Sequence, residues 1–259
     1  MSQRKSNDKL IVANWKMNLS YQAGLSYAKK LLDDQGLKKS PYEIALCPDH
    51  LSLAVISKLF KRSRFSLGAQ NAAGMDRGAQ TGDISPLDLK ALGLKYVILG
   101  HSERRALGER PSLIAAKIRA ALKAGLVPIV CLGEKLMDRE SGETRKYLNQ
   151  ELRRLFSGLK LRRSSDLIIA YEPVWAISTV RQARPLAATE ANAVHEHLKK
   201  RAAKMLGKSV RIIYGGSVNG QNAAELLGQP QIGGLLVGAA SLDINSFGKI
   251  CRFSASGKS

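Results

Sequence analysis

Three ionisable side chains that could take part in acid–base chemistry stand at the ends of apolar runs. Glu172 follows LIIAY, His101 ends YVILGH, and Lys16 lies within NWKMN. Carboxylates and imidazoles are the groups that proteins use most often to transfer protons, and a lysine that points inward adds a positive charge. Each residue also has a structural interpretation: Glu172 as an ion-pair partner, His101 as a hydrogen-bonded core residue, and Lys16 as a solvated surface lysine.

Eight short runs rich in Val, Ile and Leu are typical of strands buried on both faces of a parallel sheet. They are LIVANW (10–15), EIALCP (43–48), SLGAQN (66–71), YVILGH (96–101), VPIVCL (127–132), LIIAYE (167–172), VRIIYG (210–215) and GLLVGA (234–239). Amphipathic helical segments separate them, and no linker or low-complexity segment interrupts the series. We therefore predict one α/β domain over residues 1–259, a single (β/α)8 TIM barrel with flexible polar tails at 1–9 and 253–259. A doubly wound open sheet is the alternative, although its usual order does not need eight such units.

The helical segments carry recognisable end signals. Ser85 is the expected N-cap of a helix over 85–93, and Thr189 that of a helix over 189–206. Gly125 is expected to end the helix that precedes it, because glycine readily adopts the left-handed conformation found there.

In a (β/α)8 barrel, active-site groups lie just beyond the carboxyl ends of the strands. The predicted strands place these residues there: Asn14, Lys16, Gln70, Asn71, His101, Ser102, Glu103, Gly133, Glu134, Glu172, Gly215, Gly216, Ser217 and Gly238. YGGSV (214–218) is a short glycine turn whose N–H groups could bind phosphate, although a plain tight turn fits equally well. The common position of these residues at one mouth of the barrel is what indicates a site.

Composition narrows the class of protein. Hydrophobic residues make up 44% and charged residues 24%, which is ordinary for a globular chain. No apolar run approaches the ~20 residues that a membrane span needs, and the polar start MSQRKSNDK lacks the apolar core of a signal peptide. The three cysteines, Cys47, Cys131 and Cys251, do not form a disulfide framework, so we expect reduced thiols and a cytoplasmic protein.

The charge is unusually positive. Lys and Arg number 41 against 21 Asp and Glu, which gives a net charge of +20. Such a charge attracts anions, whether nucleic acid, acidic lipid or phosphorylated metabolites. The basic residues form short clusters such as KRSR (61–64), and the aromatic residues, 5% of the chain, do not alternate with them as a stacking platform requires. We interpret the charge mainly as solvated helix faces, and expect neither a nucleic-acid nor a membrane partner.

Other reactive side chains are weaker candidates. His195 and His197 lie two residues apart on a predicted helix and face different directions, so we expect both to be solvent-exposed. Cys131 is interpreted as a core thiol. The sequence contains no zinc, P-loop or dinucleotide-binding motif, so we predict no metal and no cofactor.

Taken together, the strand-end motifs resemble the triosephosphate isomerase family. The resemblance runs from Leu10 to about residue 247, in the family's order. The motifs that carry it are NWKMN (14–18), GAQN (68–71), GAQTGDIS (78–85), YVILGHSERR (96–105), PIVCLGE (128–134), AYEPVWAI (170–177), YGGSV (214–218) and LLVGAASL (235–242).

The resemblance implies a reaction and catalytic roles. The reaction is the interconversion of dihydroxyacetone phosphate and D-glyceraldehyde 3-phosphate through an enediolate, in glycolysis and gluconeogenesis. Glu172 would move the proton between the two carbons, and neutral His101 would polarise the carbonyl. Lys16 and Asn14 would hold the substrate oxygens, and Glu103 would be a supporting carboxylate beside them.

The resemblance also implies phosphate-binding, lid and interface residues. Backbone N–H groups would bind phosphate at Ser178, Ser217, Gly238 and Ala239. The lid and its hinge would include Pro173, Val174, Trp175, Ala176, Ile177, Thr179 and Tyr214. Thr81 would reach the active site of the neighbouring subunit in a homodimer, and Asp83 would pair with Arg104 across the interface.

Several positions depart from the family's usual pattern. Ser178, Val180 and Ala239 stand where glycine is usual, and Asp83 stands where Glu is usual. The second hinge, commonly Lys-Thr-Ala, reads RQA (181–183), with about three extra residues before the next helix. Backbone donors survive these changes where the dihedral angles permit a side chain, so we expect phosphate binding to persist with altered lid kinetics.

Two alternatives to triose phosphate isomerisation are carried forward. The altered lid is compatible with an isomerase of a larger ketose phosphate, such as a tetrulose phosphate. The charge of +20 is compatible with a non-catalytic barrel that binds a polyanion. The presence of Lys16, His101 and Glu172 together argues against the second alternative.

Overall fold

The computed structural model describes residues 9–177 and 185–252, and its eight strands close into a parallel barrel in chain order. The strands are β1 (Leu10–Asn14), β2 (Glu43–Cys47), β3 (Ser66–Ala69), β4 (Tyr96–Leu99), β5 (Val127–Leu132), β6 (Ile168–Tyr171), β7 (Arg211–Tyr214) and β8 (Gly234–Val237). Each predicted run contains one of them. The prediction of a (β/α)8 barrel is therefore confirmed, and the open-sheet alternative is wrong.

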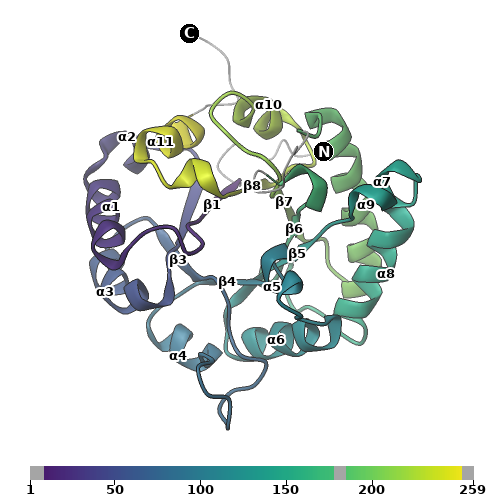
Figure 1. Cartoon of the computed structure of the whole chain (residues 1–259), viewed down its shortest axis with the longest axis horizontal. Helices are drawn as coiled ribbons and strands as arrows, with labels where there is room; N and C mark the ends of the chain where they lie inside the picture. Colours follow the sequence, from purple (N-terminus) through teal and green to yellow (C-terminus); the bar gives the residue numbers. More distant parts are fainter. Residues whose placement is uncertain (1–8, 178–184, 253–259) are drawn as a thin grey trace.

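Helices surround the strands as a ring, which Figure 1 shows along the barrel. They are α1 (Tyr21–Asp33), α2 (Gln35–Lys38), α3 (His50–Phe60), α4 (Pro86–Ala91), α5 (Ser102–Ala106), α6 (Pro111–Lys123), α7 (Leu136–Glu140), α8 (Thr144–Phe156), α9 (Ala188–Leu206), α10 (Ala223–Gly228) and α11 (Ile244–Arg252). Among the described residues, no helix is both long and apolar enough to cross a membrane.

The hydrophobic core has two layers because each strand is covered on both faces. Val12, Ile129 and Leu236 belong to the cluster that fills the barrel interior. A larger cluster, which includes Ile11 and Leu198, packs the outer faces of the strands against the helices. Alternate side chains of a strand point to opposite faces, so strands buried on both sides need near-continuous apolar residues.

Two of the three predicted helix ends agree with the structure. The Ser85 side chain accepts a hydrogen bond from the Leu87 N–H at the start of α4. Gly125 follows α6 with a φ of +81°, the left-handed conformation expected of it. Thr189 as an N-cap is wrong, because α9 starts at Ala188 and its N-cap is Ala187. Ala188 is buried, so packing of the first turn against the core starts the helix before Thr189.

Lys9 was expected to belong to a flexible tail, but it is anchored to the barrel. Its ammonium group donates hydrogen bonds to the backbone carbonyls of Leu227, Gln229 (3.0 Å) and Ile232 (2.9 Å). These carbonyls lie at the end of α10 and just before β8, so Lys9 ties the start of β1 to the last strand of the barrel. The other residues of the two predicted tails lie outside the described part of the chain.

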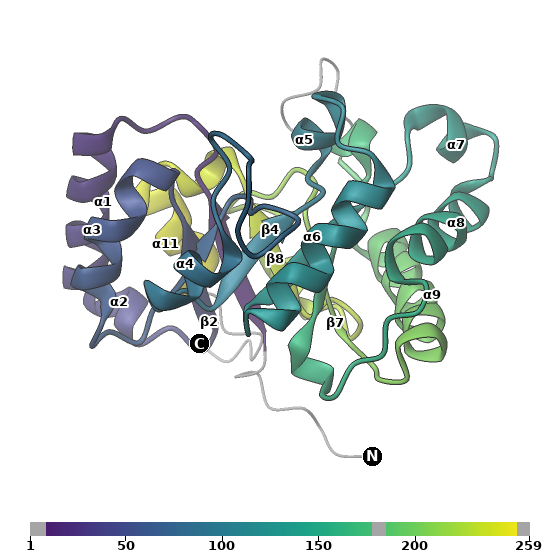
Figure 2. The ribbon, with the colours of Figure 1, turned by 90° about the horizontal axis from the view of Figure 1, so that it is seen from below.

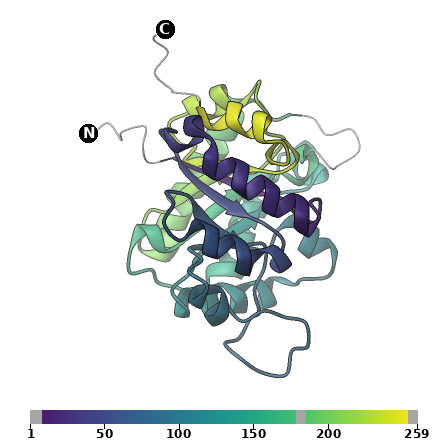
Figure 3. The ribbon, with the colours of Figure 1, turned by 90° about the vertical axis from the view of Figure 1, so that its left-hand side faces the viewer.

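Two structural features frame one end of the barrel. Figure 2 shows α5 and α7 together at this end. Figure 3 shows the segment between β3 and α4, residues 70–85, as a loop that protrudes from the body of the barrel. The predicted interface residues Thr81 and Asp83 both lie on this loop.

His195 is buried, so the expectation that it is solvent-exposed is wrong. It has no exposed surface, and its ring packs against Tyr171 and Tyr214 at centroid distances of 5.8 and 6.3 Å. Burial lowers the pKa of His195 to about 3. His197, on the same helix, is half-buried and contacts the Asn149 side chain at 3.1 Å.

The buried His195 predicts a pH-dependent stability. The unfolded chain binds a proton on this residue below its ordinary pKa of 6.5, whereas the folded chain does so only near 3. The free energy of unfolding should therefore fall as the pH drops below 6.5, by up to about 1.4 kcal/mol per pH unit. Urea denaturation between pH 7.5 and 5 measures it. His195→Phe should show a shallower decline, and equal slopes in both proteins would contradict the prediction.

Candidate active site

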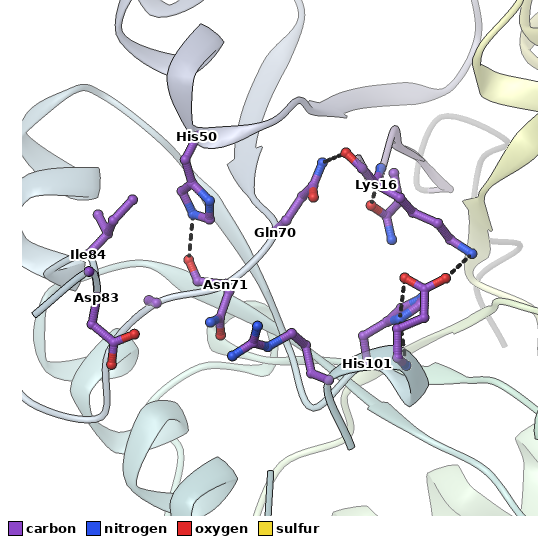
Figure 4. A pocket seen from close by; sticks show the side chains of 12 residues that line it. Lys16, His50, Gln70, Asn71, Asp83, Ile84 and His101 are labelled. Atoms are coloured by element: carbon purple, nitrogen blue, oxygen red, sulfur yellow. Dashed lines mark hydrogen bonds and ion pairs between the residues drawn. The ribbon is translucent and has the colours of Figure 1, made fainter. Parts of the chain in front are cut away.

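A pocket of about 270 Å³ opens at the carboxyl ends of the strands, and four predicted catalytic residues line it: Asn14, Lys16, His101 and Glu103. Asn14 ends β1, Lys16 follows it, and His101 follows β4. Figure 4 shows the Lys16 side chain extending across the pocket toward the segment that carries His101. The strand-end rule thus placed these residues at one mouth, as predicted from the sequence.

His101, which lines the pocket, faces the buried carboxyl group of Glu172. Nε2 of His101 lies 3.4 Å from Oε1 of Glu172, and the two residues are 6% and 3% exposed. His101 is the N-cap of α5, and its Nδ1 accepts a hydrogen bond from the Glu103 N–H at 3.2 Å. A ring nitrogen that accepts a hydrogen bond carries no proton, so this assignment places the proton of a neutral imidazole on Nε2, toward Glu172.

Lys16 points into the pocket and is not a solvated surface lysine. Its side chain is 14% exposed, and Nζ lies 2.8 Å from Oε1 of Glu103. Lys16 has a φ of +52°, the one non-glycine residue in the described chain with a positive φ. Two hydrogen bonds hold this unfavourable backbone: its N–H donates to Oδ1 of Asn14 at 3.1 Å, and its carbonyl accepts from the Gln70 amide at 2.7 Å.

The backbone of Glu172 is fixed by its neighbours on β5 and β7. Its N–H donates to the Leu132 carbonyl at 2.9 Å. Gly133 lies so close that a Cβ built on it would overlap the Glu172 carbonyl oxygen, and a Cβ on Gly215 would be 2.7 Å from Cγ of Glu172. Both positions therefore need glycine if the carboxylate is to stay where it is. This close approach explains why glycine follows β5 and β7.

The predicted core role of Cys131 agrees with the structure. The thiol is buried on β5, and burial together with the adjacent Glu172 raises its pKa well above the usual range. A thiol with a raised pKa stays protonated and is a poor nucleophile. Within residues 9–177 and 185–252, no group of three His, Cys, Asp or Glu side chains is placed to hold a metal ion.

The segment after Glu172 begins with a 3-10 turn over Val174–Ala176, which is held by Glu134. This fully buried carboxylate accepts hydrogen bonds from the Tyr171 hydroxyl and from Nε1 of Trp175, each at 3.1 Å. Its own carbonyl accepts from the Val174 N–H at 3.0 Å. Sequence reasoning placed Glu134 at a strand end without a role. The signal that could have revealed one is a carboxylate following a buried strand in the same way as Glu172.

The rest of the predicted lid is only partly described. Pro173 precedes the 3-10 turn and Ile177 follows it. Ser178, Thr179, Val180 and the predicted second hinge RQA (181–183) lie outside the described residues. Tyr214 is buried, its pKa is raised by burial, and it forms a hydrogen bond with the Leu186 backbone just beyond this segment.

Two of the predicted phosphate-binding residues can be placed relative to other parts of the site. Ser217 contacts the 3-10 turn over Val174–Ala176, and Gly238 lies beside Lys16. The N–H and the hydroxyl of Ser217 both donate to the Ala176 carbonyl at 2.8 Å, so this N–H is occupied in the structure. Gly238 follows β8, and a Cβ built on it would be 3.8 Å from Nζ of Lys16. Ala239 is exposed and begins a 3-10 turn.

The predicted interface residues lie around the same pocket. Asp83 and Arg104 line it, and Thr81 is exposed two residues before Asp83. Within this chain, Nε of Arg104 pairs with Oε1 of Glu109 at 2.7 Å. The large apolar side chains of Met17 and Leu51 are 95% and 81% exposed.

This geometry defines a class of protein. A carboxyl group and an imidazole 3.4 Å apart can move protons between adjacent atoms of a ligand. A nearby ammonium group can stabilise the negative charge that such a transfer creates. The chain is thus a (β/α)8-barrel enzyme of the acid–base type.

Comparisons with known proteins give the family. The model of the family described as triosephosphate isomerase matches residues 9–254. A triosephosphate isomerase of Rhodopirellula baltica is 42% identical, covering 94% of this chain and 96% of its own length; one of Dehalococcoides mccartyi is 43% identical, covering 95% and 96%. The crystal structure of triosephosphate isomerase from Bartonella henselae superposes with a TM-score of 0.83 at 33% identity, covering 94% of this chain and 98% of that one. The chain belongs to the triosephosphate isomerase family.

Proposed function

We propose that this protein interconverts dihydroxyacetone phosphate and D-glyceraldehyde 3-phosphate, a step of glycolysis and gluconeogenesis. Membership of the family supports this assignment. The observation that carries it is the buried pair of His101 and Glu172, with Nε2 and Oε1 3.4 Å apart, beside an inward-pointing Lys16. The proposed chemistry uses only side chains of this chain.

Each side chain has a proposed part in one proton transfer. The Glu172 carboxylate removes a proton from the carbon next to the substrate carbonyl, and the C–H electron pair becomes the double bond of an enediolate. The Nε2–H of His101 donates a hydrogen bond to the oxygen that gains negative charge. The imidazole gives its Nε2 proton to this oxygen and takes the hydroxyl proton from the oxygen on the adjacent carbon, which becomes the new carbonyl oxygen. The protonated Glu172 returns its proton to the carbon that had been the carbonyl carbon, so atoms and charge balance over the cycle.

Lys16 and Asn14 are proposed to bind the substrate oxygens. The ammonium group provides a positive charge where the enediolate is negative, and Glu103 holds that ammonium at 2.8 Å. Glu103 also contacts His101 through its backbone N–H. We infer that Glu103 is a positioning residue that keeps the cation and the imidazole on the same side of the pocket.

Phosphate binding is assigned to backbone donors at Ser178, Ser217, Gly238 and Ala239. The position of Gly238 beside Lys16 supports it. Because the Ser217 N–H donates to Ala176 in the structure, a phosphate would have to displace that carbonyl. We propose that the segment from Pro173 through Thr179, together with Tyr214, acts as a lid that excludes water from the intermediate.

We further propose a homodimer in the cytoplasm, with Thr81 reaching the partner's active site. The exposed Met17 and Leu51 and the protruding 70–85 loop support a self-association surface around the pocket. Light scattering at micromolar concentration should give twice the chain mass of 28.1 kDa. Thr81→Asp together with Met17→Asp should shift this mass toward the monomer. A wild-type mass of 28.1 kDa would contradict the proposal.

A coupled assay with both triose phosphates, beside a tetrulose phosphate, tests the function. We expect rapid turnover of the trioses in both directions. Triose turnover no better than background would overturn the proposal, and faster turnover of the tetrulose would favour the larger substrate. The polyanion alternative is tested by a gel-shift titration with RNA. The titration is done at physiological salt because such binding would be electrostatic and salt-dependent. We expect no retention of RNA.

A further inference from the structure

The hydrogen-bonded ladder between β4 and β5 ends just before the catalytic residues. Its register runs from Tyr96↔Val127 to Leu99↔Val130. The next pair in register would be Gly100 and Cys131, and the carbonyls of both accept hydrogen bonds from Arg105. Nε donates to Gly100 at 2.7 Å and Nη2 donates to Cys131 at 3.0 Å. One guanidinium group therefore continues the connection between the two strands where the ladder stops.

Arg105 also holds both peptide groups that flank His101. Its side chain binds the Gly100 carbonyl, which belongs to the peptide group before His101. Its backbone N–H donates to the His101 carbonyl at 3.0 Å, in the peptide group after it. Gly100 has a φ of +66°, and a Cβ built on it would lie 2.9 Å from Ile114 and 3.4 Å from Nη2. Glycine at this position thus lets the guanidinium group lie against the backbone.

The positive charge of Arg105 is balanced by a carboxylate on α8, one of the helices that surround the barrel. Nη1 pairs at 2.8 Å with Oε2 of Glu151, a carboxylate on α8 whose side chain is 3% exposed. The other oxygen of Glu151 pairs at 3.1 Å with Arg154, whose side chain is 56% exposed. Three donors of the Arg105 side chain have partners in three segments of the chain: Gly100 after β4, Cys131 on β5 and Glu151 on α8. The planar fork of arginine permits this arrangement, and a lysine cannot reproduce it.

On β5, the hydrogen bond from Arg105 to Cys131 lies one residue away from the strand's contact with Glu172, the proposed base. Cys131 pairs in register with Ala170 of β6, and the next carbonyl on β5, that of Leu132, accepts the Glu172 N–H at 2.9 Å. We propose that Arg105, held by Glu151, is a positioning residue that sets the distance between His101 and Glu172. The inference rests on the proposed function, since it gives these two residues their roles. Arg105 itself does not touch the reacting atoms.

The test compares two arginines that share one carboxylate. Arg105→Lys keeps the charge beside Glu151 but loses the planar guanidinium group that reaches Gly100 and Cys131. The imidazole of His101 should then be displaced, which should lower kcat about 10- to 100-fold. KM should stay within about threefold, because the proposed phosphate contacts are elsewhere. Arg154→Gln is the matched control, since it removes the other cation on Glu151 without touching β4 or β5. It should leave kcat within about twofold.

A second measurement separates positioning from stability. Labelling the four histidines with 15N reports the ring tautomers, and His101→Gln assigns the His101 signals. Arg105→Lys should shift these signals, and Arg154→Gln should not. Circular dichroism gives the folded fraction, to which kcat is referred. Equal kcat and equal His101 signals in the two variants would overturn the inference, even if Arg105→Lys unfolds at lower temperature.

A failure of the inference is distinguishable from a failure of the proposed function. If the wild type does not turn over triose phosphates, the function is wrong, and the nitrogen signals still report whether Arg105 orients the imidazole. Should Arg105→Lys be too unstable to purify, Glu151→Gln tests the same support from its other end. It should lower kcat in the same direction and shift the same His101 signals, and an unchanged Glu151→Gln protein would contradict the proposal.

Discussion

Glu172→Gln should lower kcat by about 10²- to 10⁴-fold, the range that loss of a general base typically covers. The amide has the same shape as the carboxylate and can still contact His101, but it cannot accept the proton. Substrate binding is assigned to other groups, so KM should change little. The measurement is the steady-state rate in both directions with purified protein.

The control for this substitution removes a carboxylate at the surface. Glu196 is exposed on α9 and pairs with Lys200, one turn away, at 2.6 Å. Glu196→Gln should keep wild-type kcat, which shows that the loss of one negative charge from a chain of +20 is not itself the cause. If Glu172→Gln retains more than about a tenth of wild-type kcat, the base has been assigned to the wrong residue.

Gly215→Ala is expected to have the second largest effect, about 10²-fold in kcat, because displacement of a catalytic group by about 1 Å costs this much. The added Cβ would lie 2.7 Å from Cγ and 3.2 Å from Oε1 of Glu172. The side chain cannot stay in place against such a contact, so the carboxylate must move relative to His101. The experiment measures kcat, with thermal unfolding to follow any loss of stability.

Gly228→Ala is the matched control, since nothing lies within 4 Å of a Cβ at that position on α10. It should leave kcat unchanged and favour the helix slightly. Adding Gly215→Ala to Glu172→Gln should cost little further activity, because both changes act through one carboxylate. Full additivity of the two losses would mean that Gly215 acts through some other group, and this outcome would count against our account of the site.

The local pattern of the sequence predicted the fold and the position of the site at one end of the barrel. Near-continuous apolar runs are typical of strands covered on both faces, and eight of them in alternation with helices favour a closed barrel over an open sheet. The residue after each run must then lie at the common mouth. Lys16, His101 and Glu172 followed from this rule, because the strand direction fixes where the chain emerges.

What the sequence could not decide depends on which side chains meet across elements. His195 reads as a polar residue on a helix, and its burial follows from the packing of α9 against Tyr171 and Tyr214. Thr189 reads as a cap, and the burial of Ala188 moved the helix start. In both cases tertiary packing decided the outcome, and at Thr189 it outweighed an N-cap preference worth about 1 kcal/mol.

The contacts that support His101 and Glu172 also could not be predicted from the sequence. The carboxylate of Glu134 meets the Trp175 indole 41 residues further along the chain, and Arg105 meets Glu151 across 46 residues. Residue types and their spacing in the sequence do not reveal such long-range contacts. The apolar pattern and the strand direction, readable from the sequence, determined where the acid, the base and the cation lie. Only the closed barrel decided the 3.4 Å between His101 and Glu172, because that distance depends on how β4, β5 and β6 are held together beyond the ends of their ladders.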